Sequence, residues 1–165
     1  TSTIVETARL FTSLVKRGVR TLVFSRTRKL TELVLRYSLQ DLHATAPELA
    51  PLVRGYRGGY TKEDRRLIEQ DLFREKLLGV TATCALELGI DVGSLDATLH
   101  MGFPGSLSSL WQQAGRAGRG GRRSLAVLVC FDSPLDQLFC RQPSSLLDRP
   151  AETAVVPHDL SLIHI

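Results

Sequence analysis

Short apolar runs alternate along this chain with stretches whose apolar residues recur at the spacing of a helix. The runs that predict strands are residues 21–25, 52–56, 79–83, 95–101 and 124–131. The stretches that predict helices are residues 3–17, 27–46, 61–76, 106–113 and 134–139. Because the strands are almost continuously apolar and helices separate them, the pattern predicts a parallel sheet covered by helices on both faces, with right-handed crossovers.

Ligands of such sheets bind in the loops beyond the carboxyl ends of the strands, so we expect the chemically informative residues in or just after those loops. The run 124–131 is apolar on both faces and predicts a buried strand. Pro47 and Pro51 bracket a segment that we expect to be a loop. Residues 142–165 have three prolines and no periodicity, which predicts a linker or partly ordered tail after a domain of residues 1–141.

The composition is that of a single domain with a mildly basic surface. The chain has 165 residues, 43% of them hydrophobic, a net charge of +4, and 17 arginines among its 21 positive residues. This balance is compatible with a nucleic-acid partner or with an ordinary solvated surface. No apolar run is long enough to span a membrane, so we expect no membrane partner.

Three cysteines, Cys84, Cys130 and Cys140, lack the close spacing of a zinc site or a disulfide framework. We therefore expect no metal ligands among them. Their use fits a reducing, intracellular location, which is the nucleus for a eukaryotic protein and the cytoplasm for a bacterial one.

Residues 112–119, Gln-Gln-Ala-Gly-Arg-Ala-Gly-Arg, place two arginines three residues apart, each after a glycine. The guanidinium groups of Arg116 and Arg119 carry permanent charge and a donor fork that matches phosphate oxygens. Gly115 allows the backbone to approach a ligand closely. The segment suits the charge of a phosphoryl-transfer transition state. The alternatives are a mobile basic loop or an Arg/Gly tract that binds RNA, and the position between a capped helix and a strand disfavours the tract.

Residues 81–91 lead from a strand into a short helix and a turn. The hydroxyl of Thr83 stands at the strand end, where backbone N–H groups could hold a phosphate. Gly89 permits close approach, and Asp91 can accept a hydrogen bond from a ribose hydroxyl. The alternative is an ordinary strand, helix and turn in which Asp91 caps the next turn.

Residues 21–28 end a strand with Ser25, Arg26 and Thr27. Hydroxyl and guanidinium groups in this place suit the phosphate backbone of a nucleic acid, although Thr27 could instead cap the next helix. Arg57, before two glycines, either meets a strand of DNA or pairs with nearby acids.

Taken together, residues 21–28, 81–91 and 112–119 resemble motifs IV, V and VI of superfamily 2 helicases, in that order, and the resemblance covers about residues 3–140. Gln112 and the sequence Leu-Gly-Ile-Asp replace the His and Arg-Gly-Leu-Asp of DEAD-box RNA helicases, which favours DNA helicases of the RecQ or a related type. Residues 86–119 and 124–139 look closest to the Hrq1 and MrfA family of 3′–5′ DNA repair helicases.

The resemblance implies a RecA-like three-layer sandwich with a mainly parallel sheet, the P-loop NTPase fold of a second helicase lobe. It implies that ATP binds between two lobes, with Gly89, Asp91 and Gly115 near the nucleotide. Arg116 and Arg119 would meet the γ-phosphate, Arg119 as the arginine finger. Gln112 would link the nucleotide to the nucleic acid. The implied nucleic-acid contacts are Ser25, Arg26, Thr27, Arg57 and Thr83.

The implied partners are single-stranded DNA or a duplex junction, RNA in the alternative, and an N-terminal RecA-like lobe of the same full-length chain. The sequence contains no G-x-x-x-x-G-K-[ST] and no Asp-Glu pair. We therefore expect Mg²⁺ to be held mainly by the first lobe, and residues 1–165 alone to be inactive as an ATPase. The remaining alternatives are an RNA helicase lobe and an inert nucleic-acid or protein-binding module of the same shape.

Overall fold

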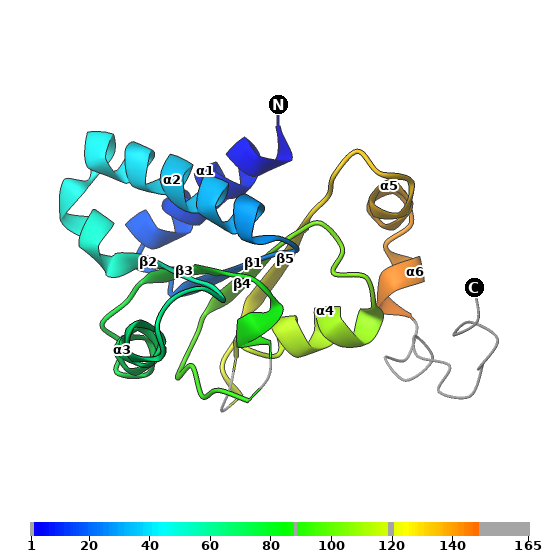
Figure 1. Ribbon diagram of the computed structural model, residues 1–165. Coiled ribbons are helices and arrows are strands. Elements are labelled where there is room, and N and C mark those ends of the chain that lie inside the picture. The colour runs from blue at the N-terminus through cyan, green and yellow to red at the C-terminus, as the bar shows by residue number, and fades with distance from the viewer. Residues whose placement is uncertain (1, 88, 119–120, 149–165) are drawn as a thin grey trace.

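All strand pairs among the described residues are parallel. The computed structural model describes residues 2–87, 89–118 and 121–148, in which five strands form one sheet of order β2-β3-β1-β4-β5 (Figure 1). The strands are β1 (Thr21–Ser25), β2 (Val53–Tyr56), β3 (Gly79–Ala82), β4 (Ala97–Met101) and β5 (Leu125–Val129). In this register Ser25, Met101 and Val129 lie side by side at the carboxyl edge.

Helices cover both faces of the sheet, which confirms the predicted three-layer arrangement. Figure 1 shows α1 (Thr3–Lys16) and α2 (Arg28–Thr45) on one face, and α3 (Lys62–Phe73) and α4 (Leu107–Ala114) on the other. The helices α5 (Pro134–Arg141) and α6 (Ser144–Leu147) follow β5. No helix in these described parts combines the length and the apolar character needed to cross a bilayer.

Two local expectations differ from the structure. Residues Pro47–Leu52, expected as a loop, form a 3₁₀ helix, η1, because Pro47 fits its first turn. Helix α3 ends at Phe73 rather than near Lys76, since Glu75 adopts a φ of 60° that no helix continues through. Helix α6 lies within the expected linker, and residues 149–165 lie outside the described residues.

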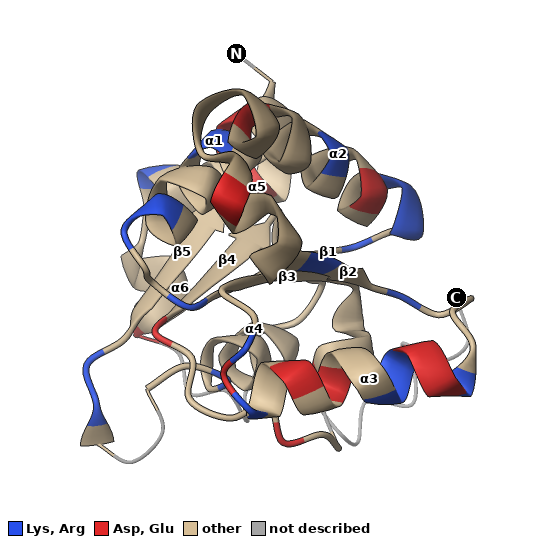
Figure 2. Cartoon of the chain, turned by 90° about the vertical axis from the view of Figure 1, so that its left-hand side faces the viewer, with Lys and Arg blue, Asp and Glu red and all other residues tan. Residues whose placement is uncertain are grey.

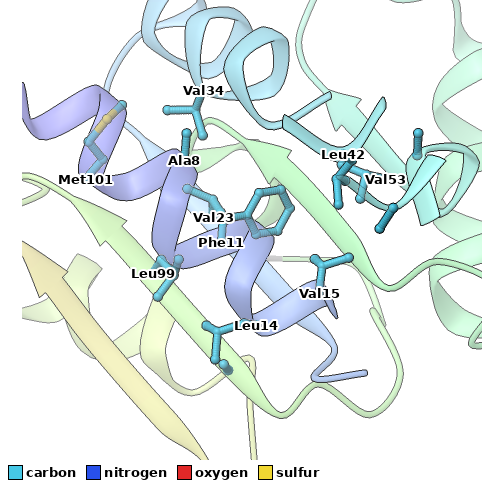
Figure 3. Close-up of a cluster of buried hydrophobic side chains, with 13 residues drawn as sticks. Ala8, Phe11, Leu14, Val15, Val23, Val34, Leu42, Val53, Leu99 and Met101 are labelled. Carbon is cyan, nitrogen blue, oxygen red and sulfur yellow. The ribbon is translucent and has the colours of Figure 1, made fainter. Parts of the chain in front are cut away.

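The core under α1 and α2 depends on a close approach between α1 and the sheet. Phe11 and Val15 of α1 are fully buried against Val23 and Leu99 (Figure 3). A Cβ on Gly79 would lie 2.5 Å from Cζ of Phe11, so only glycine at this position lets the ring rest on β3. A second cluster, under α3, fills the opposite face. The two clusters together bury β1 completely.

Strand β5 corrects the prediction that residues 124–131 form a buried strand. It pairs only with β4, at the edge of the sheet, and Leu125 is 47% exposed. An apolar run is common to central strands and to covered edges, so the pattern alone does not place a strand within its sheet.

A matched pair of leucine substitutions tests this sheet order. We expect Leu99→Ala, in the fully buried β4, to lower the free energy of unfolding by about 2–5 kcal/mol through the lost burial and the cavity that remains. Leu125→Ala, at the exposed edge, should cost less than about 1 kcal/mol. Urea denaturation measures both, and equal losses would contradict the placement of β5.

Candidate functional site

The loop after β3 is held against the end of α4 by Arg116. The loop begins with the short 3₁₀ helix η2 (Cys84–Leu86). The Nε of Arg116 donates to the carbonyl of Glu87 at 2.9 Å, and its other guanidinium nitrogens donate to the carbonyls of Glu87 and Ile90. Arg116 is 5% exposed. The segments 81–91 and 112–119, distant in sequence, are therefore in direct contact.

The side chain of Glu87 makes a second connection between this loop and α4. Its Oε2 accepts a hydrogen bond from the hydroxyl of Ser109 at 2.5 Å and from Nε2 of Gln113 at 2.9 Å. Both donors come from the same face of α4, which Ser106 caps through the backbone N–H of Ser109. The capped helix thus presents two donors to one carboxylate.

The hydrogen bonds continue from Gln113 into the sheet. Oε1 of Gln113 lies 3.0 Å from Nδ1 of His100, and Nε2 of His100 lies 3.0 Å from the hydroxyl of Thr98. His100 is 1% exposed, and its imidazole stacks on the ring of Phe24, with the ring planes 8° apart. Burial lowers the pKa of His100, with the bond to Gln113 acting in the opposite sense, so the ring stays neutral near pH 7.

A cavity of about 130 Å³ opens at the carboxyl edge of the sheet and brings several predicted residues together. Ser25 and Arg26 line it with Cys84, the residue after Thr83. Ser25 is 5% exposed, and its hydroxyl has no hydrogen-bond partner among the described residues. Arg26 is exposed, and Thr83 is half-buried with no side-chain cap bond. A buried hydroxyl without a partner is costly unless a ligand satisfies it.

The side chains of Thr27 and Asp91 both bond to nearby backbone N–H groups, as the structural alternatives for these two residues predicted. Thr27 caps α2, accepting from the backbone N–H of Leu30 at 3.3 Å. Oδ1 of Asp91 accepts from the N–H of Gly93 at 3.0 Å. Gly89 has a φ of 81° and open space where a Cβ would stand, which leaves its backbone accessible.

The last predicted residues lie at the end of α4 and beyond it. Gly115 ends the helix with a φ of −66°, which any residue adopts, and Gln112 is exposed. Arg119 lies outside the described residues.

Arg57 pairs with an acid, as its alternative predicted. Its Nε lies 2.8 Å from Oε1 of Glu32, and its guanidinium lies over the ring of Tyr60, 5.1 Å from the centroid. The neighbouring helix α3 mixes positive and negative residues along its length (Figure 2). Neither Arg57 nor α3 therefore offers a continuous basic surface.

The backbone that follows α4, at Gly118, lies near the amino end of β4 and not at the carboxyl edge of the sheet. The chemically informative residues were expected in or just after the loops at the carboxyl ends of the strands. The N–H of Gly118, however, donates to the carbonyl of Leu95 at 3.0 Å, which lies before the amino end of β4. The reason is that α4, with eight residues and about 12 Å of length, returns the chain along the face of the sheet. Arg116 therefore meets Glu87 and Ile90 on that face.

The sequence reasoning missed the connection from Glu87 through Gln113 to His100. Glu87 and Gln113 are 26 positions apart, and no spacing rule joins residues of a loop, a helix and a strand. Within residues 2–87, 89–118 and 121–148, no group of three His, Cys, Asp or Glu side chains is placed to hold a metal ion.

Comparison with known proteins gives matches over most of the chain. The family described as "Helicase conserved C-terminal domain" matches residues 4–121. ATP-dependent helicase hrq1 of Schizosaccharomyces pombe is 45% identical over 150 residues, which cover 90% of this chain and 14% of that protein. The uncharacterized ATP-dependent helicase YprA of Bacillus subtilis is 42% identical over 151 residues, 90% of this chain and 20% of that protein. The chain thus spans a fifth or less of the length of these relatives.

Solved structures give the same picture. The DUF1998 helicase MrfA bound to DNA and AMPPNP superposes with a TM-score of 0.84 and 40% identity, over 90% of this chain and 21% of that chain. Dbp5 of S. cerevisiae bound to RNA and ADP BeF3 superposes with a TM-score of 0.69 over 91% of this chain and 38% of that chain, at 17% identity. The second likeness concerns the fold alone.

The buried His100 predicts a loss of stability in acid. Its pKa is lowered in the folded state, so the unfolded state binds a proton first as the pH falls below about 6.5. The contribution of the neutral ring is therefore present above that pH and is lost below it. Urea denaturation at pH 7.5 and 5.5 should show a larger loss for the wild type than for His100→Asn, which has no group that titrates in this range. Equal losses would show that His100 does not carry this dependence.

Proposed function

The chain belongs to the helicase conserved C-terminal domain family, as a RecA-like lobe of the Hrq1 and MrfA type, and we propose that it is the second lobe of an ATP-dependent 3′–5′ DNA helicase that acts in DNA repair. The observation that carries the proposal is the 40% identity to MrfA, a helicase whose structure holds DNA and AMPPNP. The RNA-bound Dbp5 shares the fold at 17% identity only. The same two findings make DNA the proposed substrate class and RNA the alternative.

The cavity at the carboxyl edge supports a role in holding the nucleic-acid backbone. The buried hydroxyl of Ser25 can donate to a phosphate oxygen without displacing an interaction among the described residues. Arg26, the next residue, adds a guanidinium group with several donors. Thr83 adds a hydroxyl just after β3, the strand beside β1. Thr27 and Arg57 are weaker candidates, because a helix cap and an ion pair already engage their side chains.

The loop 87–91 supports a role at the edge of a nucleotide. The open backbone of Gly89 fits close approach of a phosphate, and the exposed carboxylate of Asp91 can accept from a ribose hydroxyl. Gly115 keeps the neighbouring helix end free of side chain. ATP, when bound, supplies the free energy for movement along DNA. A first RecA-like lobe of the complete protein would hold most of the ATP and its Mg²⁺.

Arg116 and Arg119 have different proposed roles. Arg119 is the proposed arginine finger. Arg116 is the second proposed γ-phosphate contact, and because its guanidinium holds the carbonyls of Glu87 and Ile90, it must exchange a carbonyl for a phosphate oxygen when the lobes close. Gln112, exposed on α4, is the proposed link between nucleotide and DNA.

Arg119→Ala in the complete protein should lower kcat for ATP hydrolysis by about 10³–10⁵, the usual effect of losing an arginine finger. The matched control is Arg122→Ala, which removes an exposed arginine that donates to the hydroxyl of Ser94 at 3.1 Å. Steady-state ATPase rates with single-stranded DNA present should leave the control within a few-fold of the wild type. A comparably small loss for Arg119→Ala would contradict the finger.

Unwinding by the complete protein tests the substrate and the direction of movement. The expected result is ATP-dependent separation of a DNA duplex with a 3′ single-stranded tail, and little separation with a 5′ tail. Faster unwinding of an RNA duplex would replace the proposal with the RNA helicase alternative. Absence of ATP-dependent unwinding of every duplex would favour an inert binding module.

A further inference from the structure

The hydrogen bonds between Glu87, Gln113 and His100 can be satisfied in only one arrangement of protons. The carboxylate of Glu87 only accepts, so the amide nitrogen of Gln113 must face it. The amide oxygen of Gln113 then accepts, and Nδ1 of His100 must carry the ring proton. Nε2 of the neutral ring therefore accepts from the hydroxyl of Thr98. Each group thus orients the next, from the sheet to the loop.

Two members of this chain of bonds, Gln113 and Glu87, contact the two regions of the site. Gln113 and Ser109 line the cavity that contains Ser25 and Arg26. Glu87, to which both of these side chains donate, begins the stretch that Arg116 holds and that leads to Gly89. A ligand in the cavity that moves Gln113 would therefore also move Glu87, and with it the backbone that leads to Gly89.

We propose that His100, Gln113 and Glu87 form a relay that couples the occupation of the carboxyl-edge cavity to the position of the 87–91 loop. His100 is a positioning residue within it, since it lies behind Gln113 and touches neither the cavity nor the loop. The inference rests on the proposed function for its ligands, which are nucleic acid on one side and nucleotide on the other.

The geometry distinguishes a relay from a simple core contact. A core histidine could be replaced by another stacked aromatic ring, because the contact with Phe24 would persist. A relay needs a donor at the place of Nδ1, because the amide oxygen of Gln113 would otherwise be buried without a partner and free to rotate away from its present orientation.

Two variants of the complete protein separate these roles. His100→Phe keeps the stacked ring and removes the donor. His100→Asn loses the ring but keeps an amide nitrogen the same number of bonds from the backbone as Nδ1. Two quantities are measured for each: the ratio of ATP turnover with single-stranded DNA to turnover without it, and the rate of backbone hydrogen exchange in residues 83–91 by mass spectrometry.

The relay predicts that His100→Phe lowers the stimulation by DNA about tenfold, within the roughly 5–150-fold range of couplings between sites, and speeds exchange in residues 83–91. His100→Asn should restore both values toward those of the wild type. Wild-type stimulation and exchange in His100→Phe would overturn the relay, as would equal loss of both in the two variants.

The same experiment keeps the two proposals apart. If the wild-type protein shows no ATP turnover that DNA stimulates, the proposed function fails. Hydrogen exchange then decides the relay by itself: faster exchange in His100→Phe but not in His100→Asn supports it, and any other pattern overturns it.

Discussion

The contact between Arg116 and the carbonyls of Glu87 and Ile90 is the interaction on which the site depends. It joins a loop that follows β3 to the end of a helix that follows β4, and the residue is almost completely buried there. A planar guanidinium satisfies several carbonyls at once, which a lysine could not do with the same geometry. The loop and the helix end are therefore joined, and they carry the proposed nucleotide contacts Gly89, Asp91 and Gly115.

The sheet places this unit beside the proposed nucleic-acid contacts at its carboxyl edge. Parallel pairing puts the ends of β1 and β3 side by side, so Ser25 lies next to the loop that begins at Thr83. Helix α4 then returns beneath the sheet and brings Gln113, in its last turn, to Glu87. The two regions of the site thus meet on one face of this short helix, where Ser109 and Gln113 both line the cavity and donate to Glu87.

Local signals in the sequence predicted most of the fold. Strand 21–25 has the predicted bounds, and Thr27 caps the following helix, because apolar runs and hydroxyl caps act over a few residues. The exposure of β5 and the pairing of Glu87 with Gln113 could not be predicted, since both depend on which distant segments become neighbours. The motif residues were found by pattern, whereas the identity of the acid that pairs with Arg57, Glu32, emerged only from its neighbours in space.

A structure of the complete protein with AMPPNP and single-stranded DNA tests the central claim most directly. The distances to measure run from the Arg119 guanidinium to the γ-phosphate and from the Ser25 hydroxyl to the DNA backbone. The account predicts hydrogen-bond lengths of about 3 Å for both, with residues 87–91 still packed on α4. A nucleotide and a DNA strand bound on other surfaces, out of reach of both side chains, would contradict it.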